Sequence, residues 1–281
     1  MIIIRKVKNF EEVKDYVFKM SFNDSTASYP RHDNKADLEK RFKKYLGEEE
    51  TEVVAAYDGD TLCGVCSFFW IEEDLYCQSI LMLANGEYEL VMDEFFKYIK
   101  EVRKGYELFV GFPTTNLEAL EYLSKHYKCS EYSVVTDYKK DINIECACSN
   151  IIEITKDNFS EYKDFHDKYA LANEMYWKAD NLVNSLDYFY VYAYKEADQI
   201  IGSIFARKGN VFQEIVGFFV DDKAPAIYEK LLKKFMSRVK NDVSVIDILY
   251  FIDESEKIEL ENAMNQGFRI KEYYKMFRVN L

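Results

Sequence analysis

The spacing of apolar residues predicts strands and helices that alternate along the whole chain. Residues 62–71 form an almost unbroken apolar run, which is typical of a strand buried on both faces. Residues 226–239 place Ile227, Leu231 and Phe235 at four-residue intervals, the stripe of a helix that packs on one side. The pattern therefore predicts a mixed α/β protein with period-two and period-3.6 segments in turn.

Both halves of the chain have the same order of expected elements. The order is strand, helix, helix, three strands, helix, strand, helix and strand. In the first half the ranges are 2–7, a helix from Asn9, 36–46, 51–57, 62–71, 75–83, 89–102, 107–111, 116–125 and 130–138. In the second half they are 151–155, 159–169, 176–186, 189–194, 200–206, 211–220, 226–239, 244–251, 256–265 and 269–279.

The repeat is also visible in the residues. Segments 2–16 and 151–165 are identical at seven of fifteen positions, counted without a gap. Glu12 and Glu161 follow Asn9 and Asn158 at capping-box spacing, which predicts that each asparagine opens a helix. A period this long indicates two complete domains rather than a solenoid. We expect domains at 1–146 and 147–281, joined by a short segment near 143–150.

Composition narrows the classes of function. The chain of 281 residues is 48% hydrophobic and 31% charged, as expected for a soluble globular protein. A formal charge of -13 argues against nucleic acid as a partner and is compatible with a cationic amine. No apolar run approaches the roughly 20 residues that span a bilayer, and the N-terminus does not resemble a signal peptide. We expect a cytoplasmic protein that binds no membrane.

The cysteines and histidines do not predict a metal site. Cys63 and Cys66 have the spacing of a zinc or redox pair, and Cys146 and Cys148 could add two ligands. In a strand, however, residues three apart face opposite sides, so buried thiols are the expectation. The histidines are scattered along the sequence, and His166 is expected to be partly exposed.

Several stretches are similar to the GNAT superfamily of N-acyltransferases. Residues 214–220, followed by the helix with Leu231 and Leu232, resemble its fourth strand and third helix. Gly267 and Phe268 stand where that fold has a Gly-Phe turn before the last strand. Asn116, Ala119 and Tyr122 resemble the signature of its fourth helix. The likeness covers both halves and implies two tandem GNAT-like α/β (α+β) domains, each with a mixed, mainly antiparallel central sheet flanked by helices.

The resemblance implies a reaction and residues for it. In GNAT proteins the fourth and fifth strands splay apart, and the pantetheine of acetyl-CoA or another acyl-CoA pairs with the fourth strand. An amine of a small molecule or peptide attacks the thioester directly, so the transferred group is an acyl group other than an aminoacyl group. Glu214 takes the position of the general base, and Tyr122 that of the acid for the leaving thiolate. Tyr176 and Trp177 would wall the acceptor site. The residues implied at the cofactor are Phe218, Val220, Ala224, Asn85, Gly86 and Asn116.

The chain departs from the GNAT pattern at the pyrophosphate loop. Residues 221–226 contain no glycine and include Pro225, and residues 83–87 contain one glycine, Gly86. A second interpretation is therefore open, in which the chain is a binding or regulatory protein that keeps the fold without catalysis. Under it, Glu214 is a solvated strand carboxylate, Asn116 a helix cap, and Tyr122, Tyr176 and Trp177 are packing residues. The oligomeric state stays open under both interpretations.

Overall fold

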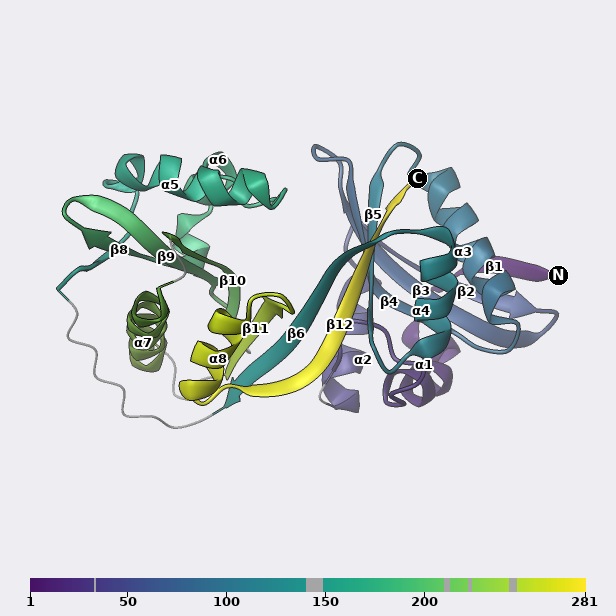
Figure 1. The fold of residues 1–281 in the computed structure, drawn as a ribbon. Helices are drawn as coiled ribbons and strands as arrows, with labels where there is room; N and C mark the ends of the chain where they lie inside the picture. Colours follow the sequence, from purple (N-terminus) through teal and green to yellow (C-terminus); the bar gives the residue numbers. More distant parts are fainter. Residues whose placement is uncertain (33, 140–148, 210–212, 222–223, 243–246) are drawn as a thin grey trace. The chain divides into compact units, whose positions relative to one another are not determined.

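The computed structural model describes residues 1–32, 34–139, 149–209, 213–221, 224–242 and 247–281. They form two compact units (Figure 1). The first unit contains residues 1–133 and 272–281, and the second contains 134–271. The expected junction near 143–150, with the boundary after residue 146, lies almost wholly outside the described residues.

The first unit is a sheet with helices on both faces. Its elements are β1 (Ile2–Lys6), η1 (Phe10–Glu12), α1 (Lys14–Ser21), α2 (Lys35–Tyr45), β2 (Thr51–Asp58), β3 (Thr61–Ile71), β4 (Tyr76–Ala84), α3 (Tyr88–Val102), β5 (Glu107–Pro113), α4 (Leu117–His126) and the start of β6 (Cys129–Lys139). The strand order runs β1-β2-β3-β4-β5-β12. One core holds Val17 and Phe42 of α1 and α2, and another holds Phe95 and Leu123 of α3 and α4.

The second unit repeats this arrangement. Its elements are the end of β6, β7 (Ile151–Glu153), α5 (Phe159–Ala172), α6 (Ala179–Asn184), η2 (Leu186–Tyr188), β8 (Phe189–Glu196), β9 (Gln199–Arg207), β10 (Gln213–Val220), α7 (Pro225–Asp242), β11 (Asp247–Asp253), α8 (Lys257–Asn265) and the start of β12 (Arg269–Asn280). The strand order runs β6-β11-β10-β9-β8-β7. Helices α5 and α6 cover one face of β8 to β10, and α7 covers the other (Figure 1).

The predicted fold class is confirmed. Most strand pairs are antiparallel, whereas β4 with β5 and β10 with β11 are parallel. The antiparallel meanders follow from the tight turns of the sequence, such as Gly59 with a φ of 60° between β2 and β3. None of the described helices has both the length and the apolar character needed to cross a membrane.

Two local predictions are wrong. Glu12 accepts a hydrogen bond from the Asn9 N–H at 3.2 Å, as the capping box predicts. Asn158 also opens a helix, α5, as predicted, but its side chain forms no cap bond. It accepts from the Thr155 N–H at 2.7 Å, and Glu161 pairs with Lys195, so the capping box predicted for the second copy is absent.

The second wrong prediction concerns the faces of β3. Cys63 is the extra residue of a bulge, which shifts the side-chain alternation. Cys63 and Cys66 therefore lie in the same core and not on opposite faces.

Candidate functional site

In each unit two parallel strands pair briefly and then separate. β4 pairs with β5 from Tyr76 to Gln78, and β10 pairs with β11 from Gln213 to Ile215. A bulge follows each paired stretch, at Ile80 in β4 and at Val216 in β10. Beyond it, no further pairing of either strand couple is seen within the described ranges. This splay is the position at which a GNAT protein receives the pantetheine arm, and both units have it.

The splay of the first unit is filled by the chain itself. The Ser28 Oγ accepts a hydrogen bond from the Met82 N–H of β4 at 3.0 Å. The Tyr29 N–H donates to the Gly111 carbonyl of β5 at 3.1 Å. Residues 27–29, which we call the plug segment, thus connect the two separated strands through hydrogen bonds.

Asn116 takes part in the same contact. Its Nδ2 donates to the Ala27 carbonyl of the plug segment at 3.0 Å, and its Oδ1 accepts from the Ala119 N–H at 3.2 Å. The side chain is buried. Both ends of this amide are engaged within the protein, so Asn116 acts as a helix cap and as an anchor for the plug segment.

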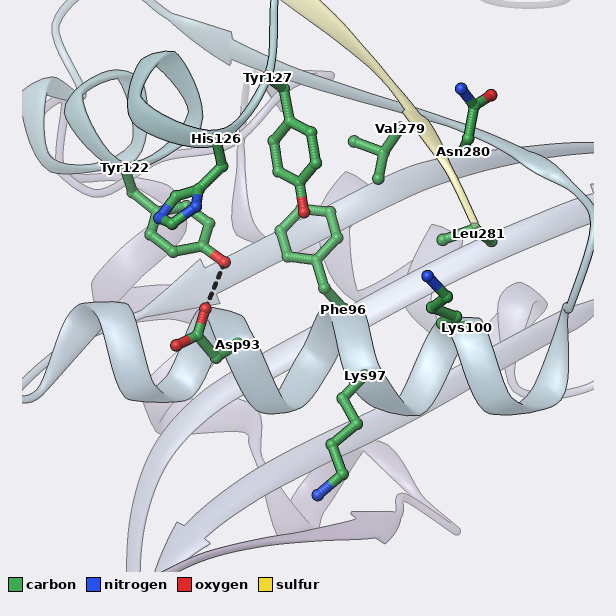
Figure 2. Close-up of a pocket in the computed structure, with 10 residues that line it drawn as sticks. All are labelled: Asp93, Phe96, Lys97, Lys100, Tyr122, His126, Tyr127, Val279, Asn280 and Leu281. Atoms are coloured by element: carbon green, nitrogen blue, oxygen red, sulfur yellow. Dashed lines mark hydrogen bonds between the residues drawn. The ribbon is translucent and has the colours of Figure 1, made fainter.

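Tyr122 faces α3 (Figure 2). Its hydroxyl donates to the Asp93 Oδ1 at 2.7 Å, and its ring stacks on Phe96 with centroids 6.0 Å apart. Burial, and then the Asp93 carboxylate, raise the pKa of Tyr122 above its usual value. The ring lines a pocket of about 300 Å³ between α3, α4 and the end of β12.

The loop before α3 carries Asn85 and Gly86. The Asn85 Oδ1 accepts from the Tyr16 hydroxyl at 3.2 Å, and its N–H donates to the Cys63 carbonyl at 3.0 Å. Gly86 is exposed and has a φ of 75°, a conformation that favours glycine. The first turn of α3 then carries the Glu89 carboxylate, which pairs with Lys125 at 2.8 Å.

Glu214 lies in the paired part of β10, two residues before the bulge. The register pairs it with Arg207 of β9 and with Leu249 of β11. The side chain is partly exposed, yet burial raises the pKa of its carboxyl above the ordinary value, and the Arg207 charge opposes this. A carboxylate with a raised pKa binds a proton more readily, as a general base must.

Tyr176 and Trp177 precede α6 in the connection from α5, rather than lying in a helix as expected. The His166 Nε2 donates to the Trp177 carbonyl at 2.6 Å, and the Asn181 Nδ2 donates to the Tyr176 carbonyl at 2.8 Å. The Trp177 ring meets the Phe189 ring with centroids 4.7 Å apart. His166 is fully buried, so the expectation of partial exposure is wrong.

The register places Glu214 and the Trp177 contact on one sheet face. Phe189 of β8 pairs with Arg207 of β9, which pairs with Glu214 of β10. Residues paired across antiparallel strands point to the same side. The structure thus brings the predicted base and the predicted acceptor wall to the face that α5 and α6 partly cover.

The predicted cofactor residues of the second unit lie around the end of β10. Phe218 and Val220 are buried in the core beneath α7, where the Phe218 ring meets the Tyr228 ring at 4.8 Å. The Ala224 carbonyl accepts from the Ile227 N–H at 3.0 Å and so belongs to the start of α7. Their side chains are engaged in packing, which leaves the backbone as the part that can meet a ligand.

Two polar pairs flank this region. The Tyr250 hydroxyl donates to the Glu259 carboxylate between β11 and α8. Asp221, after β10, accepts from Lys168 at 2.5 Å and from the Tyr169 hydroxyl. Burial acts to raise the pKa of Asp221, but the bonds from Lys168 and Tyr169 outweigh it and lower that pKa. Lys168 therefore neutralises the Asp221 carboxylate, which begins the segment that the GNAT resemblance implies as the pyrophosphate loop.

Arg207 and the plug segment were not predicted as site residues. Arg207 belongs to no sequence motif, and its neighbour across the sheet cannot be identified before the strand register is known. Residues 27–29 have no periodic pattern that would place them between two strands. In the part of the chain that the structure describes, no cluster of three or more His, Cys, Asp or Glu side chains could hold a metal.

Comparisons in sequence find no match, neither with a protein-family model nor with a curated protein. In structure, the chain is similar to a GCN5-related N-acetyltransferase from Sphaerobacter thermophilus, with a TM-score of 0.64 and 10% identity over 99% of this chain and 95% of that one. It is also similar to a tandem GNAT protein from the clavulanic acid biosynthesis pathway, with a TM-score of 0.56 and 9% identity over 99% and 98%. These likenesses show the fold, which is a tandem GNAT fold.

Proposed function

We propose that the protein is an N-acyltransferase that moves an acyl group, such as acetyl, from acyl-CoA to an amine, and that the reaction takes place in the second unit. Glu214 carries this proposal, because it combines a raised pKa with a position beside the splay of β10 and β11. The first unit has Gln78 at the matching register, and an amide cannot accept the proton.

The chemistry that the residues support is direct transfer. Acyl-CoA supplies the activated thioester when bound. The amine nitrogen forms a bond to the thioester carbon and the carbon–sulfur bond breaks. The amine proton passes to Glu214, and the released thiolate takes a proton from water. Tyr176 and Trp177 wall the acceptor side, where aromatic faces attract an ammonium group.

The two units differ in their fit to the cosubstrate. In the first, the plug segment already bonds to the Met82 N–H, so a pantetheine arm would have to displace it. In the second, the connection between α5 and α6 bonds to His166 and Asn181 instead. The Lys168 ammonium offsets the Asp221 carboxylate near the end of β10, so that carboxylate does not by itself repel an anionic cosubstrate. These contacts support one cosubstrate site per chain, in the second unit.

The test is calorimetric titration of the full-length chain with acetyl-CoA and CoA, followed by an assay of thiol release with an amine panel. We expect binding of about one acetyl-CoA per chain. Glu214→Gln should lower kcat/KM about 10²- to 10⁴-fold, the usual contribution of general base catalysis. Gln78→Ala is the matched control and should leave the rate unchanged. Absence of acetyl-CoA binding would overturn the proposal.

The second candidate is a GNAT-fold binding or regulatory protein without catalysis. The plug segment favours it for the first unit, and the buried pair of Tyr250 and Glu259 favours it for the second. Acetyl-CoA binding without thiol release for any amine would support this candidate.

A further inference from the structure

Arg207 stands next to the proposed base on the same sheet face. The register aligns Phe189, Arg207 and Glu214 across β8, β9 and β10, and we call these three residues the acceptor row. Side chains of directly paired residues have Cβ atoms about 4.5–5.5 Å apart. The row therefore places an aromatic ring, a guanidinium and a carboxylate in succession, and the Phe189 ring is buried against Trp177.

The guanidinium of Arg207 is available to a ligand. Arg207 is exposed, and no carboxylate of the described residues forms an ion pair with it. Its positive charge acts to lower the pKa of Glu214, against the effect of burial. An arginine presents a planar fork of N–H donors that matches a carboxylate.

The first unit lacks this arrangement. The equivalent row there pairs Thr51 with Phe69 and Phe69 with Gln78, so both charged positions are uncharged. The sheet of this fold therefore forms without a charged residue at either of the two positions. The cation and the carboxylate appear together in only one of the two copies, the one whose splay the plug segment does not fill.

We propose that the acyl acceptor is an amine that also carries a carboxylate, as an α-amino acid does, with Arg207 binding the carboxylate and Glu214 the amine. This inference rests on the proposed acyltransferase function. In an α-amino acid, two bonds of about 1.5 Å each separate the amine nitrogen from the carboxyl carbon. Neighbouring side chains of paired strands can therefore hold both groups at once. The acceptor's own side chain then lies toward Trp177, which is half-buried and packs on the Phe189 ring, and this favours an apolar or aromatic side chain.

The experiment compares amines that differ only in the anionic group. Thiol release from acetyl-CoA is measured for the full-length chain with amino acids and their carboxamides, for example phenylalanine and phenylalaninamide. A charge-assisted bond predicts a preference of about 10- to 100-fold in kcat/KM for the carboxylate form. Arg207→Gln should abolish that preference by raising KM for phenylalanine more than KM for phenylalaninamide, whereas the loss of its charge beside Glu214 acts on both substrates alike. Lys208→Gln, the next residue, which lies over Tyr190 on the opposite face, is the control and should behave like the parent chain.

The outcomes separate this inference from the proposed function. Equal use of acids and amides, or the same preference in Arg207→Gln, overturns the inference and leaves the acyltransferase intact. Binding of acetyl-CoA without transfer to any amino acid also overturns it. If acetyl-CoA does not bind at all, the proposed function fails, and direct titration with phenylalanine and phenylalaninamide decides the inference. Tighter binding of phenylalanine than of phenylalaninamide, lost in Arg207→Gln, then supports the site. Equal binding of the two ligands, or no binding of either, overturns it.

Discussion

At the scale of single residues, the environment of Glu214 couples function to stability. Burial raises the pKa of its carboxyl in the folded chain above the ordinary value of 4.5. The folded state therefore holds the proton more tightly than the unfolded state, and the stability falls as pH rises through this window. Glu214→Gln removes the buried charge. We expect the variant to melt at a higher temperature than the parent chain at pH 8 and the difference to shrink at pH 4.

The control for this prediction is an exposed carboxylate of the same sheet. Glu196 ends β8 and lies in solvent, so Glu196→Gln should leave the melting temperature nearly unchanged at both pH values. A stability gain in Glu214→Gln that is equal at pH 8 and pH 4 would mean that the buried charge is not its cause.

Tyr122 is the second residue whose environment makes a prediction. Its hydroxyl donates to Asp93 of α3, so Tyr122→Phe removes a bond between α3 and α4. We expect a loss of about 1 kcal/mol in the free energy of unfolding, typical of one hydrogen bond, with an unchanged rate of acyl transfer. Denaturant unfolding and the thiol assay measure the two effects. A fall in kcat of a hundredfold or more would instead support the role of a thiolate acid implied by the GNAT resemblance.

At the scale of elements, the plug segment makes a prediction about the first unit. Ser28→Ala leaves the buried Met82 N–H without its partner, which costs about 1–3 kcal/mol. We expect faster hydrogen exchange at the Met82 amide and a lower melting temperature. Ser25→Ala is the matched control, because Ser25 is exposed and its hydroxyl donates to the nearby Asn23 side chain. Unchanged exchange at Met82 would show that the plug segment does not protect the splay.

Regular elements could be predicted from the sequence, and contacts between distant segments could not. The stripe with Ile227 and Leu231 predicts α7 because burial on one side repeats with the helical period. The role of Glu214 as a base was predicted from the resemblance of residues 214–220 to the fourth strand of GNAT proteins. Arg207 was missed, because its relation to Glu214 depends on register, which the pattern of one strand does not define. Ser28 was missed because one hydroxyl that meets one amide far away leaves no periodic signal.

At the scale of the whole molecule, the two copies of one fold have diverged in what they present. The expected domains, 1–146 and 147–281, follow the repeat, but the compact units exchange the ends of two strands. β6 begins in the first unit and ends in the second, and β12 does the reverse. The last ten residues therefore complete the unit that contains the N-terminus. The repeat in the sequence does not show that the end of β12 returns to the first unit, because this return depends on which strand β12 pairs with.

This exchange predicts how the chain responds to being divided after residue 146. A fragment of residues 1–146 lacks the strand that pairs with β5 from Pro113 to Glu107. It also lacks Phe277 and Val279, which are buried in its core, and each such side chain contributes about 1.5–3 kcal/mol. That loss is comparable with much of the 5–15 kcal/mol that stabilises a typical domain. We expect fragment 1–146 to be unfolded or aggregated alone, and to copurify with fragment 147–281 when both are expressed together. Circular dichroism and size-exclusion chromatography measure this, with the intact chain as control. Two fragments that each fold as stable monomers would show that β12 is dispensable to the first unit.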